Sequence, residues 1–270
     1  MSGALRYEWV RIRTIASSYW MSGIAIALTA AIALLLATTL NRADFSEAGI
    51  TDSVLSNIVV IGGGSLPGIP ILAAAFMAVL GALTMGHEYR YGTNKATLSA
   101  LPDRVVVIAA KVAILVVWVA AVVATAVVID IVIAWLFMDH LSLGSETVRP
   151  VFAYLCYCEG FAIAGLGLSA VFRNQTGAIV AVLVWPYVVE PIVFGIMAVI
   201  SRSSNAGIGK LTNLLPASAG RRTMFDPYSV WAGFGGQIDS WGLPASFVVF
   251  ALGVLAALVA GSVLFITRDA

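Results

Sequence analysis

Six long apolar runs divide this sequence, and each is long enough to cross a lipid bilayer as a helix. They cover about residues 21–40, 67–86, 105–138, 150–172, 176–200 and 243–266. An α-helix rises about 1.5 Å per residue, so about 20 apolar residues span the hydrocarbon core. Inside lipid every backbone polar group needs an internal partner, and a helix provides one. The sequence therefore predicts an all-α membrane protein with about six transmembrane helices.

The composition indicates that lipid surrounds most of this chain. Hydrophobic residues make up 60% of it and charged residues only 11%, whereas a soluble domain carries about 25% charged residues. Water cannot accommodate so much apolar surface, so the lipid bilayer is an expected partner. The formal net charge is +1, which gives no electrostatic reason to expect nucleic acid as a partner.

Residues 1–20 are predicted to form an amphipathic helix in front of the six-span transmembrane domain, which covers residues 21–270. Four apolar residues recur at the spacing of one helical face, namely Leu5, Trp9, Ile12 and Ala16. Three arginines lie off that face, namely Arg6, Arg11 and Arg13. Such a helix is expected to lie flat at the interface with its arginines among lipid headgroups. A solvated helical extension is the alternative.

The placement of Lys and Arg predicts the orientation, because cytoplasmic loops carry more of them. With the N-terminus inside, nine basic residues fall on the cytoplasmic side and six outside. We therefore expect a multi-pass protein of the plasma membrane with both termini in the cytoplasm. Residues 201–241, an outer connection with a re-entrant pattern, hold four of the six outer basic residues. That connection is the main argument against this topology.

The cytoplasmic loop at residues 87–104 carries the most informative motif. Gly92 is predicted to end the second span, Thr93 to cap a short helix from Asn94 to about Ala100, and Pro102 to end that helix. A short helix flanked by charges of both signs can dock a soluble partner. Mixed charges between membrane helices are also common, so an ordinary charged loop is the alternative.

The run Glu88-Tyr89-Arg90-Tyr91-Gly92-Thr93, followed by Leu101-Pro102-Asp103-Arg104 and Lys111, resembles the segment after the second span of ABC type-2 exporter permeases. The resemblance extends over the whole chain, from the first helix to the connection before the last span. It implies the transmembrane subunit of an ATP-driven exporter, working as a homodimer or heterodimer with two soluble ABC ATPase subunits. It also implies that the short helix is a coupling helix seated on the ATPase. The coupling segment would then comprise Glu88, Tyr89, Arg90, Gly92, Thr93, Lys95, Pro102 and Arg104.

The chain lacks the phosphate-binding loop G-x-x-x-x-G-K-[ST] that ATP hydrolysis of this kind requires. The nearest approach is Gly209-Lys210, with Ser204 in place of the first glycine and Leu211 in place of the hydroxyl residue. We therefore expect that the chain is not an enzyme and holds no cofactor of its own. ATP and magnesium would belong to the partner subunit.

Three acidic residues, Asp130, Glu159 and Glu190, lie within apolar runs, where an acid indicates a functional site. Asp130 falls near the outer edge of its run, so a wetted interfacial acid explains it. Glu159 and Glu190 share a depth by helical rise. One hypothesis is that both line an outer cavity and that one of them pairs with Arg221 or Arg222. A carboxyl group hydrogen-bonded between packed helices is the alternative.

The sequence is also compatible with two other functions. A secondary transporter could move protons through Glu159 and Glu190, although the six spans show no internal repeat of the kind such folds carry. A membrane assembly factor is the other alternative. No metal site is expected, because Cys156 and Cys158 point to opposite sides of a helix and both histidines are far away in sequence.

Small residues recur on single helical faces at Gly253, Ala257 and Gly261 and at Gly165 and Ser169. Such stripes allow helices to approach closely. Packing within one chain is the expected explanation, and a dimer contact is the alternative. The prolines Pro186 and Pro191 frame Glu190 and are expected to distort the fifth span.

Overall fold

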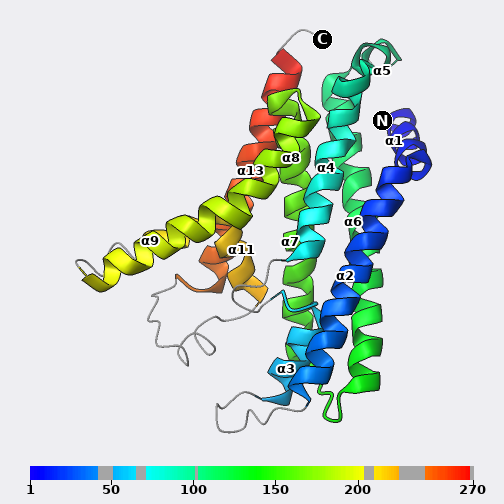
Figure 1. The fold of residues 1–270 in the computed structure, drawn as a ribbon. Coiled ribbons are helices and arrows are strands. Elements are labelled where there is room, and N and C mark those ends of the chain that lie inside the picture. Colours follow the sequence, from blue (N-terminus) through cyan, green and yellow to red (C-terminus); the bar gives the residue numbers. More distant parts are fainter. Residues whose placement is uncertain (42–50, 65–70, 101–102, 204–209, 225–240, 268–270) are drawn as a thin grey trace.

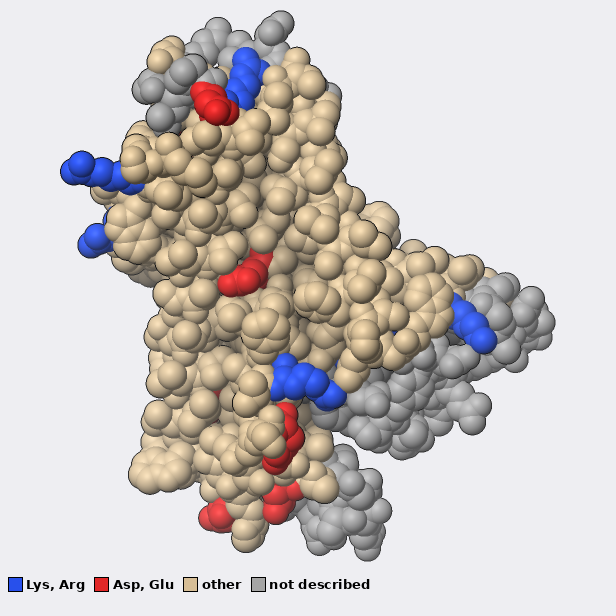
Figure 2. Space-filling view, turned by 180° about the vertical axis from the view of Figure 1, so that it is seen from behind, with Lys and Arg blue, Asp and Glu red and all other residues tan. Residues whose placement is uncertain are grey.

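A computed structural model describes residues 1–41, 51–64, 71–100, 103–203, 210–224 and 241–267 of the chain. Every regular element within these ranges is helical, and six helical segments are long and apolar enough to cross a membrane. The predicted fold class is confirmed: the chain is an all-α, multi-pass membrane protein. Figure 2 shows one face that is mostly uncharged, with one acidic side chain near its middle and the other charged side chains above and below it.

Six segments correspond to the predicted spans. They are α2 (Ala16–Leu40), α4 (Leu72–Tyr91), α6 (Arg104–Phe137), α7 (Ser145–Phe172), the series α8 (Gln175–Val184), η2 (Trp185–Val189) and α9 (Glu190–Ser203), and α13 (Leu243–Thr267). Shorter helices lie between or before them. These are α1 (Ser2–Thr14), α3 (Asp52–Val60), α5 (Asn94–Ala100), η3 (Lys210–Leu214) and α11 (Pro216–Met224).

Helix α7 forms the centre of the bundle and packs against α4, α6, α11 and α13, while α2 packs against α4 and α6. Helices α1 and α5 lie at one end of the bundle together with the C-terminal turns of α13, and α3 lies at the other end (Figure 1). We call these the α5 end and the α3 end. The main core contains buried side chains from α4, α6 and α7, among them Met77, Leu115 and Tyr154.

Two helix crossings are so close that only glycine fits. A Cβ atom at Gly165 of α7 would lie 2.1 Å from the carbonyl oxygen of Ala78 in α4. A Cβ atom at Gly261 of α13 would lie 2.3 Å from the carbonyl oxygen of Gly167 in α7. The small residues predicted to pack within one chain therefore do so, because backbone contact replaces side-chain contact at both crossings.

Helix α1 forms, but the predicted amphipathic pattern is not confirmed. Its buried face carries Ala4, Glu8 and Ile12, so it includes a charged residue. Trp9, which the predicted apolar face contains, is 37% exposed. The apolar spacing did not identify the inward face, because that face is fixed by an ion pair with other helices, described below.

The fifth predicted span does not run straight. Its course contains a π-helical turn at Trp185–Val189, which includes Pro186 and is followed by Pro191. Proline has no backbone N–H to donate, and a π-turn re-aims the helix that follows it. Helix α8 follows the bundle, whereas α9 leaves it sideways (Figure 1). The predicted distortion of this span by its prolines is confirmed.

Candidate functional site

Four charged side chains from three helices form one ion-pair network at the α5 end. Arg11 of α1 places Nη1 3.0 Å from Oε2 of Glu8 and 2.8 Å from Oε1 of Glu88. Lys111 of α6 places Nζ 2.7 Å from Oε1 of Glu8 and 2.5 Å from Oε1 of Glu88. Each cation therefore contacts both carboxylates, and each carboxylate contacts both cations.

The network is buried, so its stability depends on the balance between its positive and negative charges. The exposed fraction of the side chain is 0% for Lys111, 4% for Glu8 and Glu88, and 13% for Arg11. Removing a charge from water costs several kcal/mol, and only close pairing offsets that cost. Two cations and two anions make the network neutral as a unit. Loss of any one member would leave an uncompensated buried charge.

Local helix geometry explains how the sequence brings these residues together. Glu8 and Arg11 are three residues apart and therefore share one face of α1. That face packs against α6, which carries Lys111, and the Arg11 guanidinium also donates to the backbone oxygen of Thr84 in α4. The network thus ties α1 to α4, in the turns just before its C-terminus, and to the first turns of α6.

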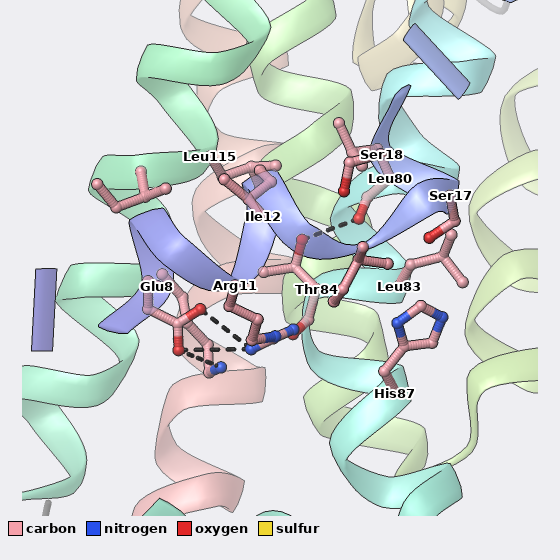
Figure 3. A pocket seen from close by; sticks show the side chains of 13 residues that line it. Glu8, Arg11, Ile12, Ser17, Ser18, Leu80, Leu83, Thr84, His87 and Leu115 are labelled. Atoms are coloured by element: carbon pink, nitrogen blue, oxygen red, sulfur yellow. Dashed lines mark hydrogen bonds and ion pairs between the residues drawn. The ribbon is translucent and has the colours of Figure 1, made fainter. Parts of the chain in front are cut away.

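A pocket opens beside the network, with a volume of about 340 Å³ including its open part. Apolar side chains such as Leu80, Leu83 and Leu115 form one part of its wall, and charged groups form another. Figure 3 shows Glu8 and His87 on opposite sides of Arg11, whose guanidinium lies between Glu8 and Thr84. Since Arg11 and Glu8 already satisfy one another, the pocket is a recess at the edge of the network.

Directly after the network, α4 ends as the sequence predicts. Gly92 has φ 66°, in the left-handed region, and the N–H of Thr93 donates to the Glu88 carbonyl at 3.1 Å. This is the usual way in which a glycine terminates a helix. The short helix α5 (Asn94–Ala100) then has the predicted bounds. Glu88 therefore joins the network through its side chain and the helix-ending turn through its backbone.

Among the side chains that the structure describes, Thr97 and Leu98 fasten α5 to the bundle. Thr97 is buried, and its hydroxyl lies 3.5 Å from the hydroxyl of Tyr7 in α1. Leu98 packs against a buried cluster that includes Met85 and Phe265. The opposite side is open, and we call its exposed residues the α5 edge. They are Arg90, Tyr91, Gly92, Thr93, Ala96 and Ser99.

The structure divides the predicted coupling residues into three groups. Arg90, Gly92 and Thr93 belong to the α5 edge, while Tyr89 is half-buried against the same cluster as Leu98. The side chain of Lys95 and the whole of Pro102 lie outside the described residues. The remaining two, Glu88 and Arg104, lie at contacts between helices of the bundle.

Glu88 and Arg104 hold helices together. Glu88 is 3% exposed within the network, so a partner cannot reach it directly. Arg104 donates through Nη1 to the carbonyl oxygens of Phe265 and Ile266, both at 3.0 Å. These carbonyls belong to the last turn of α13, where a cation is favourable because the helix leaves them without intrahelical partners. Arg104 thus joins the start of α6 to the end of α13.

Asp130 does not lie in a wetted, interfacial position. Its side chain is 0% exposed in the packed interior of α6. Hydropathy and rise predicted its depth along the helix but could not predict which side of the helix it occupies. Glu159 of α7 is half-buried, so the two acids have different surroundings.

Glu190 is buried and fully hydrogen-bonded. Its Oε1 accepts from Trp185 Nε1 at 3.0 Å and from the backbone N–H of Ala217 at 2.9 Å. Its Oε2 accepts from the backbone N–H and the hydroxyl of Ser218. No ion pair among the described residues joins Glu190 or Glu159 to an arginine. The predicted pairing with Arg221 or Arg222 is therefore wrong, and the alternative of a hydrogen-bonded carboxyl group describes Glu190.

Arg222 lies on α11, the helix that Glu190 holds, but its guanidinium does not contact the Glu190 carboxylate. Its guanidinium donates to Asn213 Oδ1 and to the carbonyl oxygen of Thr212, at 2.7 Å for the latter. Arg222 therefore links α11 to η3. Glu190 holds the other end of α11, so both ends of this helix are fixed by side-chain hydrogen bonds.

Glu8 is the member of the candidate site that sequence reasoning missed. It lies in a helix whose other inward residues are apolar or small, and an acid three residues before an arginine is the only local signal. Within the described ranges, no three His, Cys, Asp or Glu side chains come together as a metal ion requires. No protein-family model matches the chain, and no curated protein matches its sequence.

Proposed function

We propose that the chain is the transmembrane permease subunit of an ATP-driven exporter and that the α5 edge docks a separate soluble ATPase. The observation that carries this proposal is the asymmetry of α5. One side is fastened by Tyr7, Thr97 and Leu98, while the other side is exposed beyond the end of the membrane helices. A helix held in this way can receive a contact without moving independently of the bundle.

The ion-pair network supports the proposal by supplying a mechanical connection. A partner pressing on α5 acts on the turn at Gly92, and this turn is bonded to the Glu88 carbonyl. The Glu88 side chain is paired with Arg11 and Lys111 of two other helices. Displacement of α5 is therefore expected to move α1, α4 and α6 together. Buried charge pairs resist separation, so they suit a rigid connection.

The remaining parts of the proposal follow from the resemblance of the motif. The α5 end would face the cytoplasm, the membrane would be the plasma membrane, and a second permease chain would complete the translocation path. ATP and magnesium would bind to the ATPase partner. The described spans would form the apolar walls of that path.

The test is copurification of the full chain from its native membrane in mild detergent, followed by measurement of ATP hydrolysis. We expect a soluble ATPase to accompany the wild-type chain. Ala96→Trp places a bulky side chain on the α5 edge and is expected to remove the ATPase. The double variant Glu88→Leu with Lys111→Met removes one acid and one cation, so it keeps the buried charges balanced, and it is expected to retain binding but to uncouple hydrolysis from transport.

The matched control is Ser145→Trp, which adds the same side chain to an exposed residue at the α3 end. It is expected to bind the ATPase as the wild type does. The proposal is wrong if no ATPase accompanies the wild-type chain, or if Ala96→Trp and Ser145→Trp bind it equally well. In that case proton flux through the chain would be the next property to measure.

A further inference from the structure

Asp130 is a buried carboxyl group whose two oxygens have no hydrogen-bond partner in the described part of the chain. Its side chain is 0% exposed, and both Oδ1 and Oδ2 are unpartnered. Buried polar groups are nearly always hydrogen-bonded, so such a group needs an explanation. The other buried acids have partners: Glu8 and Glu88 are ion-paired, with only Oε2 of Glu88 left unpartnered, and Glu190 accepts four hydrogen bonds.

The position of Asp130 along α6 places it at the depth of lipid-facing side chains. Val128 and Val132, on either side of it in sequence, are 61% and 48% exposed. Trp135, at 70% exposed, follows about 7 Å farther along the helix axis, and tryptophan is enriched at the membrane interface. Asp130 therefore points into the protein at a level where the outside of the helix is apolar.

Among the residues that the structure describes, no cation is placed to neutralise Asp130. Lys111, on the same helix, is about 28 Å away along the axis. The charged groups of α1 and α4 lie at the opposite, α5 end, and α13 contains no charged residue. Helix α2 offers only Tyr19 as a titratable side chain, and α3 offers only Asp52, which is exposed.

Helix α7 supplies the titratable neighbours of Asp130. Arg149 is exposed near the start of α7, whereas Tyr154 and Cys158 are both 0% exposed and lie one turn apart. The Tyr154 hydroxyl makes no hydrogen bond of ordinary geometry among the described residues, and it interacts first with the Cys158 thiol, one turn away, and more weakly with Asp130. The unpartnered Asp130 carboxyl group and a weakly bonded hydroxyl group thus occur at the contact between α6 and α7.

An ionised carboxylate in these surroundings would be strongly unfavourable. Without a paired cation, a buried carboxyl group is stable only in its neutral form. A neutral carboxylic acid can donate its own proton, and a tyrosine hydroxyl can accept or donate one hydrogen bond. The surroundings of Asp130 therefore suit the protonated acid and exclude the bare anion.

We propose that Asp130 is a proton-binding site within the membrane, with Tyr154 as its positioning residue. The proton is bound while α6 and α7 are packed as described here. It is released when this contact opens to water from the α3 end, which lies nearest. The site is separate from the α5 edge, so this inference holds whether or not an ATPase docks there.

The test uses the purified full chain in lipid nanodiscs and infrared spectroscopy of the carbonyl stretch of protonated carboxylic acids at neutral pH. We expect a band in the wild type that is absent from Asp130→Asn and present in Glu159→Gln, the matched control. Tyr154→Phe is expected to shift the band because it removes the neighbouring hydroxyl. A band that Asp130→Asn retains, or no such band at neutral pH, would overturn the proposal.

Thermal unfolding provides a second measurement that does not depend on assigning a band. Asn has nearly the shape of the neutral acid but does not titrate, so Asp130→Asn is expected to match the stability of the wild type at acidic pH. As the pH rises from acidic to neutral, only the wild type should lose stability, because its unfolded chain releases the Asp130 proton while its folded chain keeps it. A large loss of stability in Asp130→Asn at neutral pH would mean that a carboxylate is required. If sodium also raised the thermal stability of the wild type, the ligand of Asp130 would be a metal cation, and proton binding would be refuted.

Discussion

Glu190 on α9 caps the N-terminus of α11 through Ser218, which lies 28 residues later in the chain. One carboxylate oxygen accepts from the Ser218 backbone N–H at 2.8 Å and from its hydroxyl at 2.9 Å. The other accepts from the Ala217 N–H at 2.9 Å. The first N–H groups of a helix have no intrahelical acceptor, and a negative charge there is also favoured by the helix dipole. A membrane helix thus supplies the cap of a separate short helix.

Glu190→Gln is predicted to loosen α11. The amide keeps one acceptor oxygen but presents an NH₂ group to N–H donors, so at least one buried donor loses its partner. Loss of a hydrogen bond to a charged group costs about 1.5–3 kcal/mol. We expect lower thermal stability and faster proteolysis within residues 204–240. Glu159→Gln, at a half-buried site, is the control and should change neither property; equal behaviour of the two variants would contradict the capping role.

Some helix boundaries could be predicted from sequence, because they depend on local chemistry, whereas the short helices α3 and α11 were not predicted. Gly92 and the residues after it predicted α5, and the prolines around Glu190 predicted the distortion that appears as η2. Six apolar runs predicted the fold class for the same reason. In each case the physical cause lies within a few residues of its effect.

The side on which a residue lies could not be predicted in the same way. Asp130 was expected to be wetted but is buried, because α6 is apolar all round and its sequence does not show which side packs against the bundle. Glu8 was missed because, apart from the nearby Arg11, its partner is Lys111, which lies 103 residues away in the chain. Glu190 was expected near arginine but binds a helix N-terminus instead. These three outcomes depend on tertiary packing, which a single sequence without homologues does not specify.

Lys111→Met is predicted to be strongly destabilising. Methionine has a similar length but leaves Glu8 and Glu88 with only Arg11 to balance them in a buried site. Breaking a buried ion pair by removing one partner costs about 3–5 kcal/mol. The measurement is thermal or denaturant unfolding of the detergent-solubilised chain. Adding Glu88→Leu to Lys111→Met should recover part of the loss, since it restores charge balance between Glu8 and Arg11.

The control for this prediction is Arg13→Met, which removes an arginine from the exposed face of α1, the helix that carries Glu8 and Arg11. Arg13 lies 5.6 Å from the Trp9 ring centroid, an interaction of modest strength at an exposed site. It should therefore change stability much less than Lys111→Met does. If the two variants unfold alike, or if Glu88→Leu adds to the loss, the network is not the source of stability.

Gly81→Ala is predicted to force α4 and α7 apart. A Cβ atom at Gly81 would lie 1.8 Å from the carbonyl oxygen of Ala162, a backbone atom that cannot turn away. We expect a marked loss of thermal stability and of the folded fraction recovered from membranes, since overpacking costs about 1–3 kcal/mol or more. Gly23→Ala in α2 is the matched control, because a Cβ atom there meets nothing within 4 Å. Equal yields of the two variants would show that the crossing is looser than described.

Gly92→Ala is predicted to weaken coupling to a partner while leaving the fold intact. A Cβ atom at Gly92 meets nothing within 4 Å, so its only cost is the left-handed backbone at φ 66°. That cost is about 1–2 kcal/mol for an ordinary residue and less for asparagine, which adopts this conformation more readily. The strain can be relieved by unwinding the end of α4 and turning α5 away from Tyr7. We therefore expect ATPase stimulation by the chain to fall in Gly92→Ala and to recover in Gly92→Asn, with thermal stability nearly constant in both. A fall of the same size in both variants would assign the effect to the added side chain on the α5 edge, and no fall in either would show that the turn at Gly92 has no part in coupling.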